Sequence, residues 1–160
     1  MINKITIIGV GLIGGSLARA LKSNNLANIV FGYGRDQNRL EAATKEGIID
    51  QYSTDLKIAV DGADIIVIAT PVGSFESLLH DLKPFITQHM IVTDVGSTKS
   101  SIANSAKNIL DEMLSNFIPA HPIAGKEKSG FEASDAGLFL NKKVIITPLD
   151  TNLSEAINTI

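Results

Sequence analysis

The chain has 160 residues, of which 44% are hydrophobic and 19% charged, and its formal net charge is −3. That length accommodates one domain with a complete hydrophobic core, and the composition is typical of a folded globular protein. No lysine- or arginine-rich block is present to neutralise phosphates, so nucleic acid is not an expected partner. Without cysteine, the chain has no disulfide framework, no thiolate metal site and no cysteine nucleophile. We expect no bound metal.

The N-terminal residues lead directly from Met1 into an apolar segment at Ile5. They lack the basic, apolar and small-residue regions of a secretory signal peptide. No apolar run approaches the roughly 20 residues that are needed to span a bilayer. We therefore expect a cytoplasmic protein that has no membrane partner.

Short apolar segments rich in β-branched residues alternate with segments of helical periodicity. The apolar segments are typical of strands buried on both faces, and they cover residues 4–10, 29–33, 64–70, 90–95, 117–120 and 143–147. Helical spacing of Ile13, Leu17, Ala20 and Leu21 predicts a first helix that is broken at Asn24 and Asn25. Further helices are predicted from Asp36 to Gly47, from Ser74 onward, and from Ile102 to Leu114. Asp36 and Ser74 are placed as N-caps and Gly47 as the C-terminal glycine.

Strands that alternate with helices of about 10–15 residues predict right-handed crossovers and a parallel sheet with helices on both faces. We therefore expect an α/β, doubly wound Rossmann-type fold over residues 1–150. After it, Leu153, Ile157 and Ile160 begin an apolar helical stripe that stops after about two turns, too short to be stable alone. We expect residues 151–160 to be the start of a helix that leads to a helical C-terminal domain absent from this chain.

A glycine-rich motif links the first predicted strand to the first predicted helix. It has the form GxGxxG and consists of Gly9, Val10, Gly11, Leu12, Ile13 and Gly14. In this context the first glycine permits a tight turn, the second lets the backbone approach a pyrophosphate, and the third lets the helix pack closely on the strand. The N-terminus of the helix then attracts the anion. The motif predicts a dinucleotide site, whereas glycines that only shape a turn are the structural alternative.

The end of the second strand bears on which dinucleotide binds. An NAD site usually carries an acidic residue about 20 residues past the glycine loop, but that position is Gly34, followed by Arg35. A guanidinium in place of a carboxylate suits the 2′-phosphate of NADP. Asp36 is the alternative ribose acceptor, two positions further on, or it only caps the next helix. We expect NADP to be preferred, with NAD as the alternative.

Polar residues follow three predicted strands at the sheet edge where ligands of open parallel sheets bind. Ala69, Thr70 and Pro71 end one strand where the cofactor's ribose is expected, although the Thr-Pro pair is also typical of a simple strand end. Ser97 and Lys99 follow another strand. Ser97 is placed to reach a nicotinamide or a substrate hydroxyl, or else to cap the helix that follows.

His121 is the histidine best placed for chemistry among the three in the chain. It ends an apolar strand, and Pro122 keeps it extended. A neutral imidazole at this point accepts the proton of a substrate hydroxyl while hydride leaves the same carbon. His80 and His89 lie in polar surroundings and are expected to be solvated. A lone histidine is more often structural, but the strand end next to a cofactor site favours a catalytic role.

Several motifs in this order resemble the prephenate dehydrogenase family over nearly the whole chain. Besides the glycine loop, they are residues 14–16 (GGS), 69–72 (ATPV), 94–99 (DVGSTK), 121–125 (HPIAG) and 127–130 (EKSG). The resemblance implies that His121 is the catalytic histidine and that Ser97 assists it. We expect Ser97, Lys99 and Lys126 to contact the substrate. Lys126 departs from the family pattern, in which many members have a small hydroxylated residue, so the choice between prephenate and arogenate stays open.

The reaction that the resemblance implies is NAD(P)-dependent oxidative decarboxylation of prephenate to 4-hydroxyphenylpyruvate, or of arogenate to tyrosine, in tyrosine biosynthesis. It also implies a homodimer formed through the helical C-terminal domain, so the present chain alone is expected to be inactive. Two alternatives remain. One is a Rossmann enzyme of the β-hydroxyacid dehydrogenase or reductase type, which needs a different signature after the fifth strand. The other is a non-catalytic dinucleotide-binding module, against which His121 and Ser97 argue.

Overall fold

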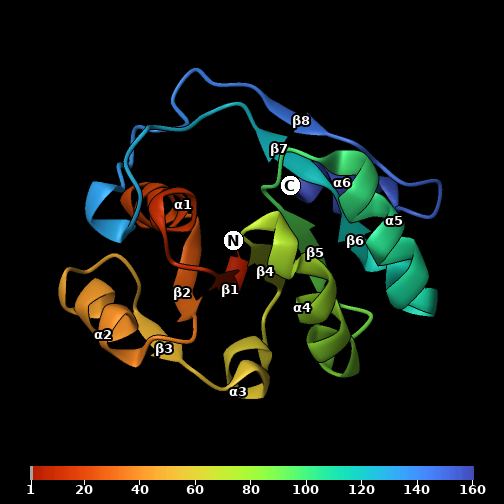
Figure 1. Cartoon of the computed structure of the whole chain (residues 1–160), viewed down its shortest axis with the longest axis horizontal. Coiled ribbons are helices and arrows are strands. Elements are labelled where there is room, and N and C mark those ends of the chain that lie inside the picture. Colours follow the sequence, from red (N-terminus) through yellow and green to blue (C-terminus); the bar gives the residue numbers. More distant parts are fainter. Residues whose placement is uncertain (1) are drawn as a thin grey trace.

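A six-stranded parallel sheet forms the centre of the molecule in the computed structural model, which describes residues 2–160 (Figure 1). Its strand order is β3-β2-β1-β4-β5-β6. The strands are β1 (Ile2–Ile8), β2 (Ala27–Tyr33), β3 (Gln51–Ser53), β4 (Ile65–Ile68), β5 (Ile91–Asp94) and β6 (Phe117–Ile118). The direction of winding reverses between β1 and β4, which is where such sheets bind ligands. The expected doubly wound fold is confirmed.

Helices cover both faces of this sheet. One face carries α1 (Leu12–Ser23) and α2 (Gln37–Lys45), and the other carries α3 (Leu56–Val60), α4 (Phe75–Leu82) and α5 (Lys99–Ile109). Successive strand residues alternate between the two cores: Ile7 and Val67 pack on the first face, and Ile8 and Ile68 on the second. This alternation explains why the central strands are apolar throughout, since both of their faces are buried.

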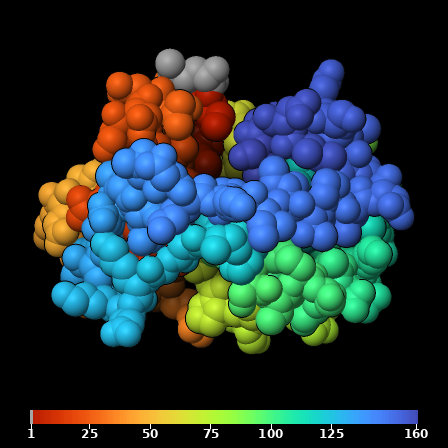
Figure 2. Space-filling view, turned by 90° about the horizontal axis from the view of Figure 1, so that it is seen from above, coloured from red at the N-terminus to blue at the C-terminus, as the bar shows by residue number. Residues whose placement is uncertain are grey.

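The chain leaves the parallel sheet at Pro119. Residues 117–120 were expected to form one strand, but only β6 joins the sheet, and β7 (Ala120–Pro122) pairs antiparallel with β8 (Val144–Ile146) in a separate two-stranded sheet. Proline has no N–H with which to continue the parallel ladder. Between β7 and β8 the chain crosses the molecule as a long segment (residues 123–143), seen in cyan to blue in Figure 2. A last helix, α6 (Ser154–Thr159), follows.

Two of the three expected helix caps are present. The Asp36 carboxylate accepts a hydrogen bond of 3.2 Å from the Arg39 N–H at the start of α2. Gly47 follows α2 with a φ of +71°, the left-handed conformation expected there. Ser74 occupies the N-cap position of α4 as expected, but its side chain makes no capping hydrogen bond. It lies in a 3₁₀ turn, η1 (Val72–Ser74), that continues into the helix, and its hydroxyl donates to the Pro71 carbonyl instead.

The helix expected as far as Leu114 ends at Ile109. Asp111 has a φ of +46°, which an α-helix does not accept, and a 3₁₀ segment, η3 (Asp111–Asn116), follows. Two further 3₁₀ turns are η2 (Lys83–Phe85) and η4 (Phe131–Ala133). Within residues 2–160, the helices are all too short or too polar to cross a membrane.

Candidate active site

The three loop glycines differ in what surrounds them. A Cβ at Gly14 would lie 2.2 Å from the Gly9 carbonyl oxygen, and Gly9 itself has a φ of +97°. A Cβ at Gly11 would meet no heavy atom within 4 Å. Gly14 therefore packs α1 against β1, Gly9 makes the turn, and Gly11 borders open space where a ligand can approach. Since no side chain caps α1 in the described structure, its first N–H groups are available to an anion.

A cavity of about 360 Å³ lies beside the glycine loop. Its lining includes Gly9, Gly34, Arg35, Thr70 and Pro71, which come from the ends of β1, β2 and β4. These residues are far apart in sequence, and the crossover between β1 and β4 brings them together.

The other expected cofactor residues lie around this cavity. Ala69 contacts the loop through its carbonyl, which lies 2.9 Å from a Cβ placed at Gly9. Leu12 and Ile13 form the half-buried first turn of α1, and Val10 packs against the core beneath α1 and α2. Asp36 does not line the cavity, because its carboxylate caps α2.

Thr70 has an unusual hydroxyl. Its Oγ1 is the one buried side-chain nitrogen or oxygen without a hydrogen-bond partner in the part of the chain that the structure describes. Leaving such a group unpaired costs free energy unless a ligand or water completes it. Thr70 lines the cavity, so its hydroxyl is placed to bond a polar group of a bound molecule.

At the end of β5, Asp94 forms the centre of a buried polar cluster. Only 1% of the residue is exposed. Its Oδ2 accepts hydrogen bonds from the Gly96 N–H at 2.7 Å and from the Lys99 ammonium, and its Oδ1 accepts one from the Ala120 N–H at 3.3 Å. Burial raises the pKa of the Asp94 carboxyl, and the bond from Lys99 opposes this rise. Burial likewise lowers the pKa of Lys99, and Asp94 opposes that change.

Ser97 and His121 are neighbours of this cluster in the chain, since Ser97 lies between Asp94 and Lys99 and His121 follows Ala120. Ser97 is exposed in the loop between β5 and α5, where the N-cap position is occupied by Thr98 without a side-chain bond. His121 is half-buried in β7, opposite Ile145 of β8. Neither side chain is engaged in a hydrogen bond within residues 2–160. His80 and His89 are exposed, as expected.

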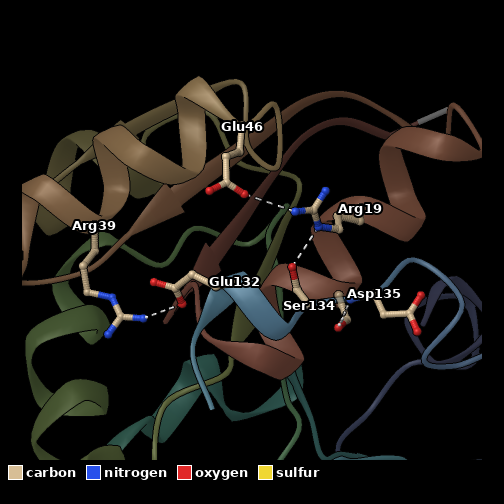
Figure 3. Close-up of polar contacts among 7 residues, drawn as sticks. Arg19, Arg39, Glu46, Glu132, Ser134 and Asp135 are labelled. Atoms are coloured by element: carbon tan, nitrogen blue, oxygen red, sulfur yellow. Dashed lines mark hydrogen bonds and ion pairs between the residues drawn. The ribbon is translucent and has the colours of Figure 1, made fainter. Parts of the chain in front are cut away.

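The segment after β7 is hydrogen-bonded to α1 through Ser134 and Asp135. The Asp135 N–H donates to the buried Ser16 hydroxyl at 3.0 Å, and Arg19 Nε donates to the Ser134 hydroxyl at 2.8 Å (Figure 3). A Cβ at Gly15 would lie 3.1 Å from that of Ser134. Sequence reasoning did not foresee these contacts, although residues 14–16 and the segment around 130 stood out as motifs. Gly15 and Ser16 of the first motif thus pack against Ser134 and Asp135, which follow the second motif, and this explains the small residue at Gly15.

Lys126 is exposed and pairs with Asp135 at 2.8 Å. The hydrogen bond from Lys126 lowers the pKa of the Asp135 carboxyl. A second ion pair, between Arg39 of α2 and Glu132 at 3.4 Å, holds the same segment (Figure 3). The Arg39 guanidinium also lies over the Phe131 ring. The segment thus rests on both α1 and α2.

The fold, the glycine loop at its switch point and the cavity beside that loop define the class of protein as a Rossmann domain of the dinucleotide-binding type. The family model described as "Prephenate dehydrogenase, nucleotide-binding domain" matches residues 17–160. The chain belongs to the prephenate dehydrogenase family.

Relatives and solved structures agree with this assignment. Prephenate dehydrogenase of Bacillus subtilis is 36% identical over 149 residues, which are 92% of this chain. The crystal structure of prephenate dehydrogenase from Aquifex aeolicus, in complex with hydroxyphenyl propionate and NAD⁺, superposes on 99% of the chain with a TM-score of 0.91 and 32% identity. Synechocystis arogenate dehydrogenase superposes on 98% with a TM-score of 0.89 and 32% identity.

The chain spans 40% of the Bacillus protein and 55% and 54% of the Aquifex and Synechocystis chains. An imine reductase from a Pseudomonas species also superposes, with a TM-score of 0.73, but at 15% identity this shows the fold alone. The likeness to a reductase-type enzyme is therefore one of architecture.

Proposed function

We propose that this chain is the dinucleotide-binding part of an enzyme that catalyses the NAD(P)-dependent oxidative decarboxylation of prephenate or arogenate. The observation that carries the proposal is the position of His121 in β7, directly after the residue that contacts the carboxyl end of β5 in the sheet whose β1 carries the glycine loop. Its imidazole is half-buried and has no hydrogen-bond partner within residues 2–160. Membership of the family and the relatives' names support the substrate class. The helical domain and the homodimer that the resemblance implies belong to this proposal.

The residues of the loop and the cavity fit a dinucleotide. The N-terminus of α1 at Gly11 would hold the pyrophosphate, and Gly34, Arg35, Thr70 and Pro71 would surround a ribose. The nicotinamide, when bound, takes up the hydride. The chain's own contribution is to orient the two reactants and to move one proton.

His121 would accept the proton of the substrate hydroxyl as hydride leaves the carbon that bears it. Loss of carbon dioxide then leaves its electron pair in the ring, and the oxygen takes a proton back as the ring becomes a phenol. Ser97, exposed in the neighbouring loop, would hydrogen-bond that hydroxyl. Lys126 would approach the side chain of the substrate after release from Asp135.

Steady-state turnover by the full-length gene product, with prephenate, arogenate and a simple 2-hydroxy acid and with each cofactor, tests this proposal. Oxidation of prephenate or arogenate with release of carbon dioxide is the expected result. Turnover of the hydroxy acid alone would assign the protein to the hydroxyacid dehydrogenases. If the protein bound the dinucleotide but turned over none of these substrates, it would be a non-catalytic binding module.

We propose NADP as the preferred cofactor because Arg35 lines the cavity and forms no ion pair within residues 2–160, whereas Asp36 is engaged as a cap. NAD is the alternative, and the Aquifex relative was crystallised with NAD⁺. A charge-assisted contact contributes about 1.5–3 kcal/mol, so NADP should bind about tenfold or more tightly than NAD.

The Arg35→Ala variant is expected to lose most of that difference in titration calorimetry. Asp36→Ala is the matched control: it should lower stability by about 1 kcal/mol through loss of the cap and leave the cofactor preference unchanged. If the unaltered protein bound NAD as tightly as NADP, or more tightly, the role of Arg35 would be contradicted. Asp36 would then be the residue expected to contact the ribose.

Thr70→Val replaces the unpaired hydroxyl by a methyl group of similar size. Since the hydroxyl has no partner to lose in the described structure, the thermal stability of the ligand-free chain should stay constant or rise. Dinucleotide affinity should fall by about 0.5–1.5 kcal/mol, the usual net contribution of one hydrogen bond. Thermal melts with and without NADP measure both quantities. A variant that is destabilised without cofactor, yet binds it normally, would contradict the role of Thr70.

A further inference from the structure

The strand that carries His121 lies outside the parallel ladder. Pairing of β5 with β6 ends at Thr93 and Ile118, where the Thr93 hydroxyl also donates to the Ile118 carbonyl at 2.7 Å. Pro119 cannot donate a main-chain hydrogen bond, and its carbonyl accepts one from Thr147 beyond β8. From Pro119 onward, main-chain pairing with β5 therefore ceases.

Side chains replace that pairing at the next residue, Ala120. Its N–H donates to Asp94 Oδ1 at 3.3 Å, and its carbonyl accepts from Lys99 Nζ at 2.6 Å. The same Lys99 ammonium also donates to Asp94 Oδ2. One ion pair thus holds both main-chain polar groups of the residue that precedes His121.

The pair is well shielded from water, since the side chains of Asp94 and Lys99 are 1% and 15% exposed. Two of the three ammonium hydrogens of Lys99 go to Asp94 and Ala120. This arrangement differs from the substrate contact that the sequence suggested for Lys99. Asp94 precedes and Lys99 follows the loop that carries Ser97. Both residues also hydrogen-bond the main chain of Ala120 in the strand that carries His121.

We propose that Asp94 and Lys99 are positioning residues, which fix the His121 strand relative to the Ser97 loop so that the imidazole and the hydroxyl face one substrate. The proposal rests on the function proposed above for His121 and Ser97. Displacement of a reacting group by about 1 Å can lower a rate about 10²-fold. Loosening the ion pair should therefore lower kcat and leave the glycine loop, and with it cofactor binding, unaffected.

The first test needs no substrate. Backbone amide hydrogen exchange at Ala120, measured by NMR on the 160-residue chain, should be slow in the unaltered protein and much faster in Lys99→Met and Asp94→Asn. Lys99→Arg keeps a cation and its donors, so it should keep most of the protection. Lys83→Met removes the surface pair of Lys83 with Asp111 and is the matched control, with no expected change at Ala120.

The second test uses the full-length gene product and prephenate or arogenate. Lys99→Met and Asp94→Asn should each lower kcat about tenfold or more, with the dinucleotide Kd unchanged and with recovery in Lys99→Arg. A rise in substrate KM in Lys99→Met alone, with normal kcat and a protected Ala120 amide, would make Lys99 a substrate ligand and overturn the proposal.

Stability separates the remaining outcomes. Removing one member of a buried pair is strongly destabilising, so the double variant Asp94→Asn/Lys99→Met, which leaves no unpaired charge, is compared with the single ones. Fast exchange at Ala120 in a folded double variant supports the positioning role. Global unfolding of all three would assign the pair to the stability of the fold and overturn it. Absence of turnover in the unaltered protein would instead refute the proposed function, while the exchange result would stand.

Discussion

Replacing His121 by asparagine in the full-length gene product should slow hydride transfer by about 10²–10⁴-fold, the usual loss when a general base is removed. Asparagine has similar reach but no basic nitrogen. Dinucleotide affinity should hardly change, because the pyrophosphate is expected at the N-terminus of α1 and not at β7. Single-turnover absorbance at the nicotinamide band, alongside a cofactor titration, measures the two effects separately.

His89→Asn is the control for this experiment, since His89 is exposed and lies before β5. It should show normal turnover and normal binding. Near-normal turnover in His121→Asn would make His121 a structural residue and require another base. A loss of cofactor binding in proportion to the loss of activity would lead to the same conclusion.

Alanine at Gly14 and alanine at Gly11 should have opposite consequences. In the interior of a helix alanine is normally favoured over glycine by about 0.8–1.0 kcal/mol. At Gly14, however, its Cβ would lie 2.2 Å from a backbone oxygen, so α1 must move away from β1. Overpacking of this kind costs about 1–3 kcal/mol, which outweighs the gain in helix propensity. Gly14→Ala should therefore lower the melting temperature of the ligand-free chain.

Gly11→Ala should act on the ligand instead. The added methyl group points into open space, so the ligand-free chain should lose at most about 1 kcal/mol through the weaker N-cap. The same methyl group occupies the approach of a pyrophosphate, and NADP should bind about tenfold or more weakly. Melting curves and titration calorimetry on both variants check the contrast. Equal losses of stability, with unchanged affinity in Gly11→Ala, would show that the glycines only shape the turn.

Hydrophobic periodicity and glycine spacing were sufficient to predict the parallel sheet and the glycine loop, because both signals are local in the sequence. Apolar runs buried on both faces predict β1 and β4 directly, and the glycines lie between a strand and a helix. β3 and α3 have only three and five residues, and β3 has no fully buried residue. Elements that short lack a periodic pattern, so they were not predicted.

The cluster around Asp94 could not be inferred from the sequence for a different reason. Its bonds join β5 to a residue 26 positions away in the chain, and nothing local to Asp94 indicates that partner. The motif around residues 94–99 marked the region as functional but suggested a substrate contact for Lys99. Only the departure of the chain from the sheet at Pro119 explains why a lysine and an aspartate are needed there.

The contacts that hold the segment after β7 also constrain the order in which the protein folds. Asp135 and Ser16 are 119 residues apart in the chain, and Ser134 and Arg19 are 115 apart. Contacts of such long sequence separation carry a large loop-closure entropy and form slowly. During synthesis, α1 and the first strands are available long before residue 134 leaves the ribosome. The segment is therefore expected to dock last on a nearly complete sheet, and the surroundings of His121 acquire their final form only at that late step.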